Sequence, residues 1–311
     1  FNFEQEFKKH VINNFVDCYK KAKTPNPCIE CNKYLKFYYF YEKALELGCN
    51  YIATGHYAKT QYCEKYKLHV LKKSKSQKKD QSYVLYNIPA NLISKIIFPL
   101  GDFETKEQIR KIADENNLQV AKKPDSQEIC FIPDNCYTKF LIENGVQAIP
   151  GNIVNKNGNI LGHHKGLIYY TIGQRKGLGI SNSTPLYVIK LDVQKNEVVV
   201  GEEQELYSKK LYANELNYIL PVDLTKPIKI DAKIRYASKQ AKATLYQVNE
   251  KLAKIEFEEP QRAITPGQSV VFYIDDIVLR RRKNCIITDF FKIIIKTFEL
   301  FSKYYSARYF M

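Results

Sequence analysis

The hydrophobic pattern of this chain changes period near Pro150, and this change constrains the fold more than any other feature. Before it, helical patterns over 4–21 and 33–47 precede a short strand-like run at 50–54, which is typical of an α/β domain. After it come short alternating runs bounded by turn residues, which predict an antiparallel sheet or barrel of about six strands. These runs are PLYVIKLD, NEVVVGE, KIDAKIRYA, ATLYQV, LAKIEFEEP and QSVVFYIDD.

Two other segments add to this outline. In the segment 98–118, Thr105 stands before Glu107 and Gln108, a pattern that predicts a helix N-cap and a small helical domain with Ile109 and Ile112 facing inward. The last segment, 285–311, is rich in Phe, Ile and Tyr but carries charged residues too closely spaced for a membrane span. We expect a helix there, packed on the barrel or lying on a membrane surface.

The net charge indicates a class of partner. The chain has 48 Lys and Arg against 33 Asp and Glu, a formal net charge of +15, and such a field attracts polyanions. Nucleic acid is therefore the first partner to consider, although AT-rich coding bias also enriches Lys, Asn, Ile and Tyr. The run KKSKSQKK at 72–79 predicts a basic loop, solvated and mobile at the surface.

Cysteine is the first candidate for chemistry. The eight cysteines lack regular spacing and follow no secretory leader, which favours a reducing compartment where thiols stay reactive. Cys28 and Cys31 form a Cys-x-x-Cys pair at the start of a predicted helix, where the helix dipole favours thiolate. Sulfur or redox chemistry and plain burial explain the pair about equally well. A zinc site ranks lowest, because no second Cys-x-x-Cys follows.

Three further segments contain chemically useful side chains. Cys130 lies between a polar loop and an apolar, strand-like end, where burial between its two apolar neighbours is the stronger interpretation of this cysteine alone. Gly55 and His56 follow the short strand, where α/β sheets bind ligands, although a turn glycine beside a surface histidine is the commoner arrangement. The stretch 79–81 suits contacts to RNA backbone and bases, or an N-cap.

Seven segments, taken in order, resemble the tRNA-specific 2-thiouridylase family, MnmA or TrmU, across residues from about 20 to 280. Their order and spacing carry this resemblance more than any single segment does. The segments are TPNPCIECNKYLKF, ATGHYAK, KDQSYVLY, PLGDFETKEQIRKIA, KKPDSQEICFI, HKGLIYYTIGQRKGLGI and RAITPGQSVVFY.

The resemblance implies a fold and a division of the chain. The fold class is α/β, the rear part of an adenine-nucleotide α-hydrolase-like PP-loop domain, followed by a small central domain and a C-terminal antiparallel β-barrel. The expected domains are the remainder of the PP-loop ATP-pyrophosphatase catalytic domain at 1–95, a central tRNA-binding domain at 96–182, the β-barrel at 183–283 and a helical extension at 284–311.

The resemblance also implies a reaction, the ATP-dependent 2-thiolation of the wobble uridine U34 in tRNAs for Lys, Glu and Gln. ATP, with Mg2+, adenylates the C2 oxygen of the uracil, and a protein persulfide delivers sulfur to C2. The sulfur comes from a cysteine desulfurase or a sulfur-relay protein. We expect a monomer without a membrane span, in the cytoplasm or, in a eukaryote, in a mitochondrion or plastid.

Individual residues match functional positions of the family. Cys130 matches the persulfide carrier and Cys31 its nucleophilic partner, which attacks the persulfide or resolves it as a Cys31–Cys130 disulfide. Gly55 matches an ATP contact, and no metal ligand is expected. The positions that match tRNA contacts are Asn26, Pro27 and Cys28 at the target base, with His56, Lys79, Asp80, Gln81, Arg235, Tyr236 and Gln268 elsewhere.

Two departures from the family pattern limit what carries over. Some members have an aspartate proposed to assist catalysis where this chain has Cys28, so no acid–base role is carried over to that position. The phosphate-binding loop of the family, Ser-Gly-Gly-x-Asp-Ser, does not occur in this sequence, although its amides should cradle the ATP phosphates. We therefore expect a partial chain, a tRNA-binding homologue without catalysis, or a loop supplied by another polypeptide.

Overall fold

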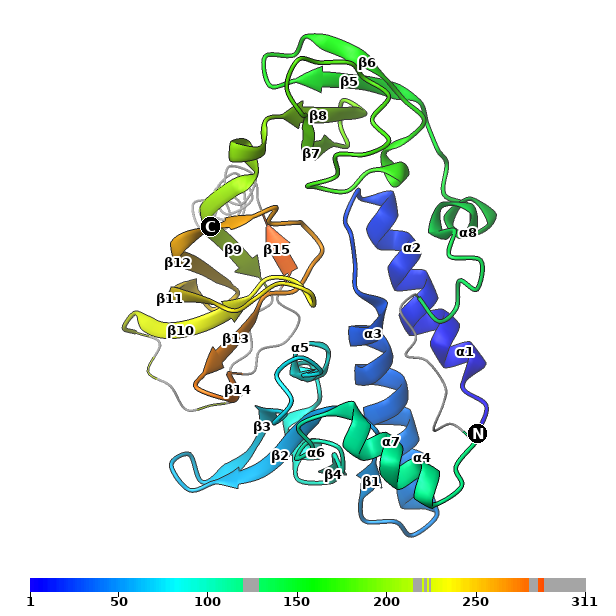
Figure 1. Cartoon of the computed structure of the whole chain (residues 1–311), viewed down its shortest axis with the longest axis vertical. Coiled ribbons are helices and arrows are strands. Elements are labelled where there is room, and N and C mark those ends of the chain that lie inside the picture. Colours follow the sequence, from blue (N-terminus) through cyan, green and yellow to red (C-terminus); the bar gives the residue numbers. More distant parts are fainter. Residues whose placement is uncertain (120–128, 215–219, 221–222, 224, 280–284, 288–311) are drawn as a thin grey trace, which may run out of the picture.

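The computed structural model describes residues 1–119, 129–214, 220, 223, 225–279 and 285–287 of the chain. N-terminal helices run along one side of the molecule, a large sheet faces them, and a smaller sheet lies at one end (Figure 1). The described helices are α1 (Glu4–Phe7), η1 (Lys8–Ile12), α2 (Asn13–Lys20), α3 (Pro27–Glu30), η2 (Cys31–Tyr39), α4 (Phe40–Glu46), α5 (Ser82–Leu85), α6 (Ala90–Ile93), α7 (Lys106–Glu115), α8 (Tyr137–Glu143), η3 (Leu167–Tyr169) and η4 (Glu203–Leu206).

Two continuous helical segments confirm the helices predicted near the N-terminus. The first runs through α1, η1 and α2, and the second through α3, η2 and α4. Within the second, η2 is π-helical, so its hydrogen bonds join residues five apart, as from the Phe40 N–H to the Leu35 carbonyl. The first segment buries Phe15 and Val16 against Leu141 of α8, which extends the N-terminal unit to residues beyond 130.

The short strand expected at 50–54 is confirmed as β1 (Ile52–Ala53), which pairs in parallel with β4 (Ile96–Ile97). The core around this pair contains Phe37 from η2 and Tyr83 from α5, and it also contains Tyr273 from the C-terminal half. The α/β part of the chain therefore shares one hydrophobic core with a strand of the large sheet.

Two of the predicted alternating runs form part of a separate four-stranded sheet, so the prediction of one sheet of about six strands was wrong. The strands PLYVIKLD and NEVVVGE pair as a hairpin, and the second of them pairs in parallel with a strand that starts at Gly151. Ile153, Val188 and Val198 fill a core of their own. The strands are β5 (Gly151–Asn155), β6 (Ile160–His164), β7 (Tyr187–Asp192) and β8 (Glu197–Gly201), in the order β6-β5-β8-β7.

The other four runs lie in a nine-stranded sheet that also takes in a hairpin from the first hundred residues. Its order is β15-β9-β12-β11-β10-β13-β14-β3-β2. The strands are β2 (Ala58–Cys63), β3 (Leu68–Lys73), β9 (Tyr207–Asn214), β10 (Ile228–Lys233), β11 (Ala241–Asn249), β12 (Leu252–Arg262), β13 (Val271–Ile274), β14 (Ile277–Leu279) and β15 (Cys285–Ile287).

The helix predicted from residue 285 onward is wrong at its start. The backbone of β15 pairs antiparallel with β9, with Cys285 opposite Asn214, and a strand so paired cannot belong to a helix. The rest of that predicted helix, 288–311, lies outside the described residues.

The basic stretch 72–79 is only in part the solvated loop that its charge predicts: Lys72 and Lys73 end β3, and the loop that follows exposes Lys75 and Lys78 but is anchored to the protein. Ser74 and Ser76 are buried, and the Lys75 N–H donates a 2.8 Å hydrogen bond to the Gly101 carbonyl. The Oδ1 atom of Asp80 accepts a 2.9 Å bond from the Ser74 N–H. These hydrogen bonds satisfy backbone N–H groups around the two buried serines. The lysines therefore extend to solvent from a segment that is anchored to the protein.

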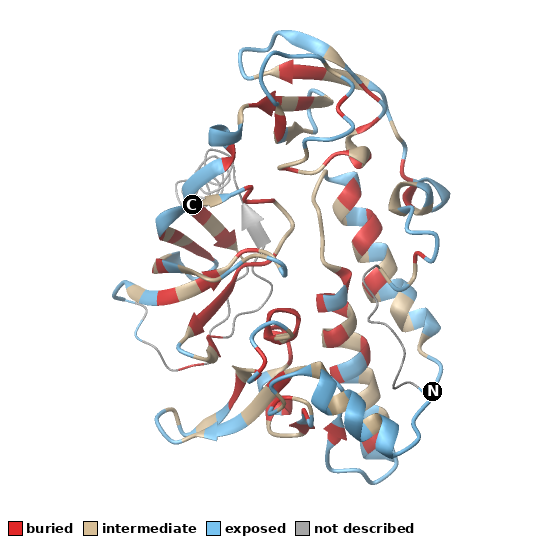
Figure 2. Cartoon of the chain, viewed as in Figure 1, coloured by how far each residue is buried: buried red, intermediate tan, exposed pale blue. Residues whose placement is uncertain are grey.

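The cap predicted at Thr105 is confirmed, but the inward face of its helix is not. Thr105 and Gln108 form a reciprocal capping box at the start of α7. Ile112 is 45% exposed, and Figure 2 shows α7 mostly in the exposed colour, whereas strands of both larger sheets carry buried residues. The local cap signal was sufficient to place the helix but not to determine what it packs on.

Candidate active site

Three cysteines from two distant segments lie within electrostatic reach of one another. Cys28 and Cys31 lie three residues apart across the start of one helix, on the same face, and the charge of Cys130 acts on both thiols. All three are free; Cys28 and Cys130 are exposed, and Cys31 is partly buried. The structure thus brings together the predicted nucleophile and the predicted persulfide carrier.

The sequence around the first two cysteines explains how the helix begins there. The side chain of Asn26 caps it, accepting a 3.1 Å hydrogen bond from the Cys28 N–H, and Pro27 occupies the first helical position, where its missing N–H costs nothing. Ile29, which lies between the two cysteines in the sequence, is buried, so its side of the helix faces the core. The predicted target-base positions therefore form the first turn that presents the thiols.

Cys130 lies in a turn, and neither the predicted strand nor the predicted burial is correct. The Ile132 N–H donates a 2.9 Å hydrogen bond to the Ile129 carbonyl, which closes the turn. Ile129 and Phe131 pack against the core around Phe15, so the two neighbours are anchored while Cys130 between them stays exposed. The preceding residues of its motif, up to 128, lie outside the described residues.

Electrostatics at the thiols runs against the prediction that the helix start favours thiolate. Desolvation by the surrounding protein raises the pKa of Cys28 even though its side chain reaches solvent, and the charge of Cys130 adds to this. Desolvation also raises the pKa of Cys31, opposed by Lys36. The predicted lowering was wrong because loss of water around a thiolate outweighs the helix terminus here.

Lys36 is a site residue that sequence reasoning missed. Its charge lowers the pKa of both Cys28 and Cys31, and its Nζ atom lies 3.4 Å from Nε2 of His56. Nothing in the spacing marks it, since residues five apart lie on different faces of an ordinary α-helix.

Gly55 and His56 follow β1, as predicted, but His56 is buried. A 2.8 Å hydrogen bond joins its Nδ1 atom to Oγ1 of Thr54, and its ring packs near Phe37 and Phe98. Burial, helped by the charge of Lys36, lowers the pKa of His56 to about 3, so the imidazole is neutral at neutral pH. Gly55 keeps its place at the carboxyl end of the parallel pair.

The predicted stretch 79–81 lies beside the thiols together with Tyr236. The Oε1 atom of Gln81 accepts a 3.0 Å hydrogen bond from the Tyr57 N–H, and its side chain also bonds to Tyr236. Desolvation raises the pKa of Tyr236, and the charges of Asp80 and Cys28 act in the same direction, opposed by Lys79. Two predicted RNA-contact segments therefore converge on Cys28.

Arg235 and Gln268 make bonds within the protein. Nη2 of Arg235 donates to the carbonyl oxygens of Ile172, at 3.1 Å, and Ala263, at 2.7 Å, and to Oγ1 of Thr265. Gln268 donates from Nε2 to the Thr24 carbonyl at 2.7 Å. These two side chains link the large sheet to the smaller sheet unit and to the thiol segment.

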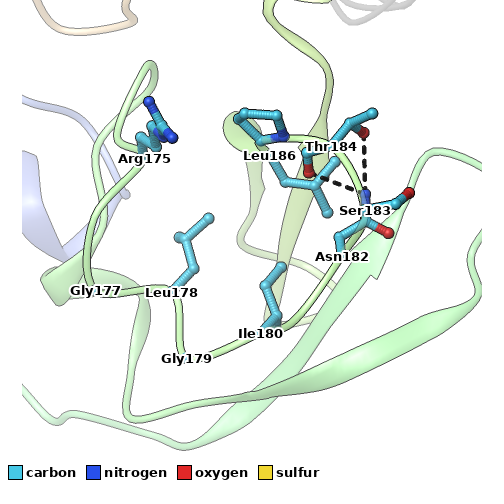
Figure 3. Close-up of a pocket in the computed structure, with 10 residues that line it drawn as sticks. Arg175, Gly177, Leu178, Gly179, Ile180, Asn182, Ser183, Thr184 and Leu186 are labelled. Atoms are coloured by element: carbon cyan, nitrogen blue, oxygen red, sulfur yellow. Dashed lines mark hydrogen bonds between the residues drawn. The ribbon is translucent and has the colours of Figure 1, made fainter.

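A separate cavity of about 360 Å³ lies in the four-stranded unit (Figure 3). Arg175 stands at one side, Leu178 and Ile180 form the apolar part, and Asn182 bonds to Thr184 at the other side. None of the predicted site residues lines it. The part of the chain that the structure describes holds no group of three His, Cys, Asp or Glu side chains placed for a metal ion.

No helix within the described ranges is long and apolar enough to cross a membrane.

Three family models match the chain in order. They are described as a tRNA methyl transferase HUP domain at residues 1–134, a tRNA methyl transferase PRC-barrel domain at 138–202 and an aminomethyltransferase beta-barrel domain at 208–279. A HUP-type α/β unit with clustered thiols, followed by two β units, defines the class of a tRNA-modifying transferase, and the predicted fold class is confirmed.

Curated relatives narrow the class. A protein of Acetivibrio thermocellus named tRNA-specific 2-thiouridylase MnmA is 52% identical over 279 residues, 89% of this chain and 77% of the relative. Proteins of that name from Halothermothrix orenii and Clostridioides difficile are 51% and 48% identical, over 90% and 89% of this chain and 78% and 77% of their own length. The chain belongs to the tRNA-specific 2-thiouridylase family of sulfurtransferase enzymes, which confirms the resemblance found in its motifs.

Proposed function

We propose that this protein catalyses the ATP-dependent 2-thiolation of the wobble uridine U34 in tRNAs for Lys, Glu and Gln. The observation that carries the proposal is that Cys130 lies within electrostatic reach of the Cys28 and Cys31 pair. A persulfide held on an exposed turn next to a second thiol is what sulfur delivery and its resolution require.

The sulfur step uses two thiols. A cysteine desulfurase or a relay protein places a sulfur atom on Cys130 as a persulfide. The thiolate of Cys31 attacks the inner sulfur of Cys130, forming the Cys31–Cys130 disulfide and releasing hydrosulfide to attack C2 of the uracil. In the alternative order, the persulfide attacks C2 directly and Cys31 then forms the same disulfide. An external dithiol returns both cysteines to thiols.

Gly55 has room beside it for an ATP contact. Among the described residues, a Cβ atom added there would come within 4 Å of Leu100 Cδ1 alone, at 3.7 Å, so the backbone after β1 is open at the edge where α/β sheets bind ligands. We assign Gly55 to ATP, with Mg2+ on the phosphates. When bound, ATP converts the C2 oxygen of the uracil into a leaving group by adenylation.

The tRNA is the polyanion that the charge of +15 attracts. The first helical turn, with Asn26, Pro27 and Cys28, is proposed to meet the target base. The stretch 79–81 and Tyr236 support the flanking nucleotides, because they lie beside Cys28. His56, Arg235 and Gln268 are proposed to act in tRNA binding through the groups that they hold in place.

Binding of tRNA without catalysis is the competing function, and the net charge alone would be enough for it. The thiol arrangement favours the enzyme, because a binding protein has no use for an exposed Cys130 beside a second thiol.

The test measures 2-thiouridine formed in tRNA, with ATP, a persulfide donor and a segment that carries the family's phosphate-binding loop, by retardation on a mercury-containing gel. We expect Cys130→Ser and Cys31→Ser to abolish product and Cys136→Ser, at an exposed cysteine in the same region, to retain it. Thiolation at the normal rate by Cys130→Ser would contradict the proposal. Salt-sensitive tRNA binding with no thiolation by the unsubstituted protein would favour the binding function instead.

A further inference from the structure

The π-helical segment η2 places Lys36 on the face of Cys31. In an α-helix, residues five apart are about 140° apart around the axis, so their side chains diverge. In η2 the hydrogen bonds join residues five apart, and such residues stack one turn above the other. The wider turn of η2 therefore places Lys36 on the same face as Cys31, which an α-helical turn would not do.

Lys33, two residues after Cys31, provides a contrast in the same segment. Its Nζ atom lies 2.7 Å from the Tyr34 hydroxyl, and its charge acts on His10. Among the residues that the structure describes, the groups that act on Cys31 are Lys36 from its own segment, Cys28 from α3 and Cys130 from a separate turn. Within that part of the chain, the cation that acts on the thiols is therefore Lys36.

A hydrogen-bonded chain holds the Lys36 ammonium in place. The Thr54 N–H donates 3.2 Å to the Ile97 carbonyl of β4, the Thr54 hydroxyl lies 2.8 Å from Nδ1 of His56, and Nε2 of His56 lies 3.4 Å from Lys36 Nζ. Since lysine has no acceptor, Nε2 accepts and the Nδ1–H donates to Thr54. This series of hydrogen bonds runs from the parallel strand pair to the Lys36 ammonium.

The buried imidazole is suited to this task because it adds no charge. His56 is only 9% exposed, and the rings of Phe37 and Phe98 pack around it. A neutral His56 that accepts a hydrogen bond from the Lys36 ammonium orients this ammonium, and because it carries no charge it does not compete with a thiolate for the positive charge.

We propose that the ammonium of Lys36, which His56 holds in place, stabilises the negative charge that moves from the Cys31 thiolate to the departing hydrosulfide. The inference rests on the proposed function. In the step concerned, the Cys31 thiolate forms a bond to the inner Cys130 sulfur, the persulfide bond breaks, and hydrosulfide leaves with the electron pair. Negative charge moves along the three sulfurs, and a fixed cation beside them lowers its cost.

The test measures alkylation of Cys31 by iodoacetamide as a function of pH, quantified on the tryptic peptide that begins at Thr24 by fragment ions that separate Cys28 from Cys31. The variants are Lys36→Met, Lys36→Arg and, as the matched control in the same segment, Lys33→Met. We expect Lys36→Met to shift the profile to higher pH and to slow alkylation at neutral pH roughly threefold or more. Lys36→Arg should restore the profile, and Lys33→Met should match the unsubstituted protein.

Two results would overturn the inference. Either an unchanged profile in Lys36→Met, with a circular dichroism spectrum like that of the unsubstituted protein, or an equal shift in Lys33→Met would show that Lys36 has no specific part. Alkylation requires neither ATP nor tRNA, so the test stands apart from the proposed function. If Lys36 shifts the profile but Cys130 never takes up sulfur from a persulfide donor, the proposed function fails and the effect of Lys36 on Cys31 remains.

Discussion

The side-chain amide of Gln268 donates a 2.7 Å hydrogen bond to the carbonyl oxygen of Thr24, 244 residues earlier in the chain. The Thr24 N–H donates in turn to the Pro266 carbonyl at 3.1 Å. A turn of the large sheet therefore holds the residues that lead into the Asn26 cap and the thiol pair. The C-terminal half fixes the position of chemistry encoded in the N-terminal half.

Removing the Gln268 donor should make Cys31 more accessible to alkylation while it costs the protein little stability. Gln268→Ala leaves the backbone bond of Thr24 intact, so we expect a loss of about 1 kcal/mol in unfolding free energy and faster alkylation of Cys31. Gln261→Ala is the control, because the bond that this amide makes within the described part of the chain goes to the nearby Glu259 carbonyl. Equal alkylation rates in the two variants would show that the Gln268 hydrogen bond does not hold the residues before Cys31 in place.

A second variant, Gly267→Ala, tests the same contact by placing a methyl group against Lys23 and Thr24. The φ of Gly267 is +89°, and an added Cβ would lie 2.7 Å from Lys23 Cβ and 3.0 Å from the Thr24 nitrogen. Gly158 has φ +87° with nothing within 4 Å, so Gly158→Ala carries the backbone strain alone. We expect Gly267→Ala to lower the thermal midpoint further than Gly158→Ala and also to slow thiolation. Equal losses of stability would mean that Lys23 and Thr24 move aside freely.

His56 should make the protein less stable in acid. Its pKa is lowered to about 3 in the folded protein, from an ordinary value of about 6.5 in the unfolded chain. Between these values the unfolded chain binds the proton, so the contribution of His56 is complete above about pH 6.5 and is lost as pH falls toward 3.

The measurement for His56 is unfolding free energy by denaturant titration at several pH values. The unsubstituted protein should lose stability over this range more steeply than His56→Gln. The ring proton signals of His56 should not titrate between about pH 5 and 8. Parallel pH curves for the two proteins would show that His56 is charged or exposed.

Asp80 should matter for the shape of the basic stretch. Its carboxylate accepts from the Ser74 N–H at 2.9 Å and from the Ser82 hydroxyl at 2.6 Å. Asp80→Ala strands buried donors, so we expect a loss of about 1–3 kcal/mol in unfolding free energy and weaker tRNA binding. Asp102→Ala, at a side chain that is 82% exposed, should change stability little. Similar losses in both variants would contradict this account.

The sequence predicted those elements whose signals are local. The capping pair Thr105 and Gln108 placed α7, and the Cys28 and Cys31 pair was expected at a helix start, which the Asn26 cap of the second helical segment confirms. The side of a helix that is buried depends on distant partners, and Ile112 shows this, since its apolar character suggested an inward face that the fold does not provide. Alternation likewise revealed the strands but could not assign β7 and β8 to the smaller sheet.

The site followed the same division. Motif order singled out Cys31 and Cys130, but the residues alone could not bring them together, because only the packing of Ile129 and Phe131 on the helical core puts their turn there. Lys36 escaped notice because the π-helical geometry that aligns it with Cys31 has no sequence pattern of its own. The sign of the thiol pKa shifts was predicted wrongly because desolvation is a property of the fold.

The most direct test of the central claim follows sulfur on the cysteines themselves. The protein is loaded with a persulfide donor, alkylated and digested, and the peptides are weighed by mass spectrometry. We predict one extra sulfur on the Cys130 peptide in Cys31→Ser, and conversion to a Cys31–Cys130 disulfide in the unsubstituted protein. Extra sulfur on Cys31 or Cys28, with the Cys130 peptide unmodified, would contradict the account.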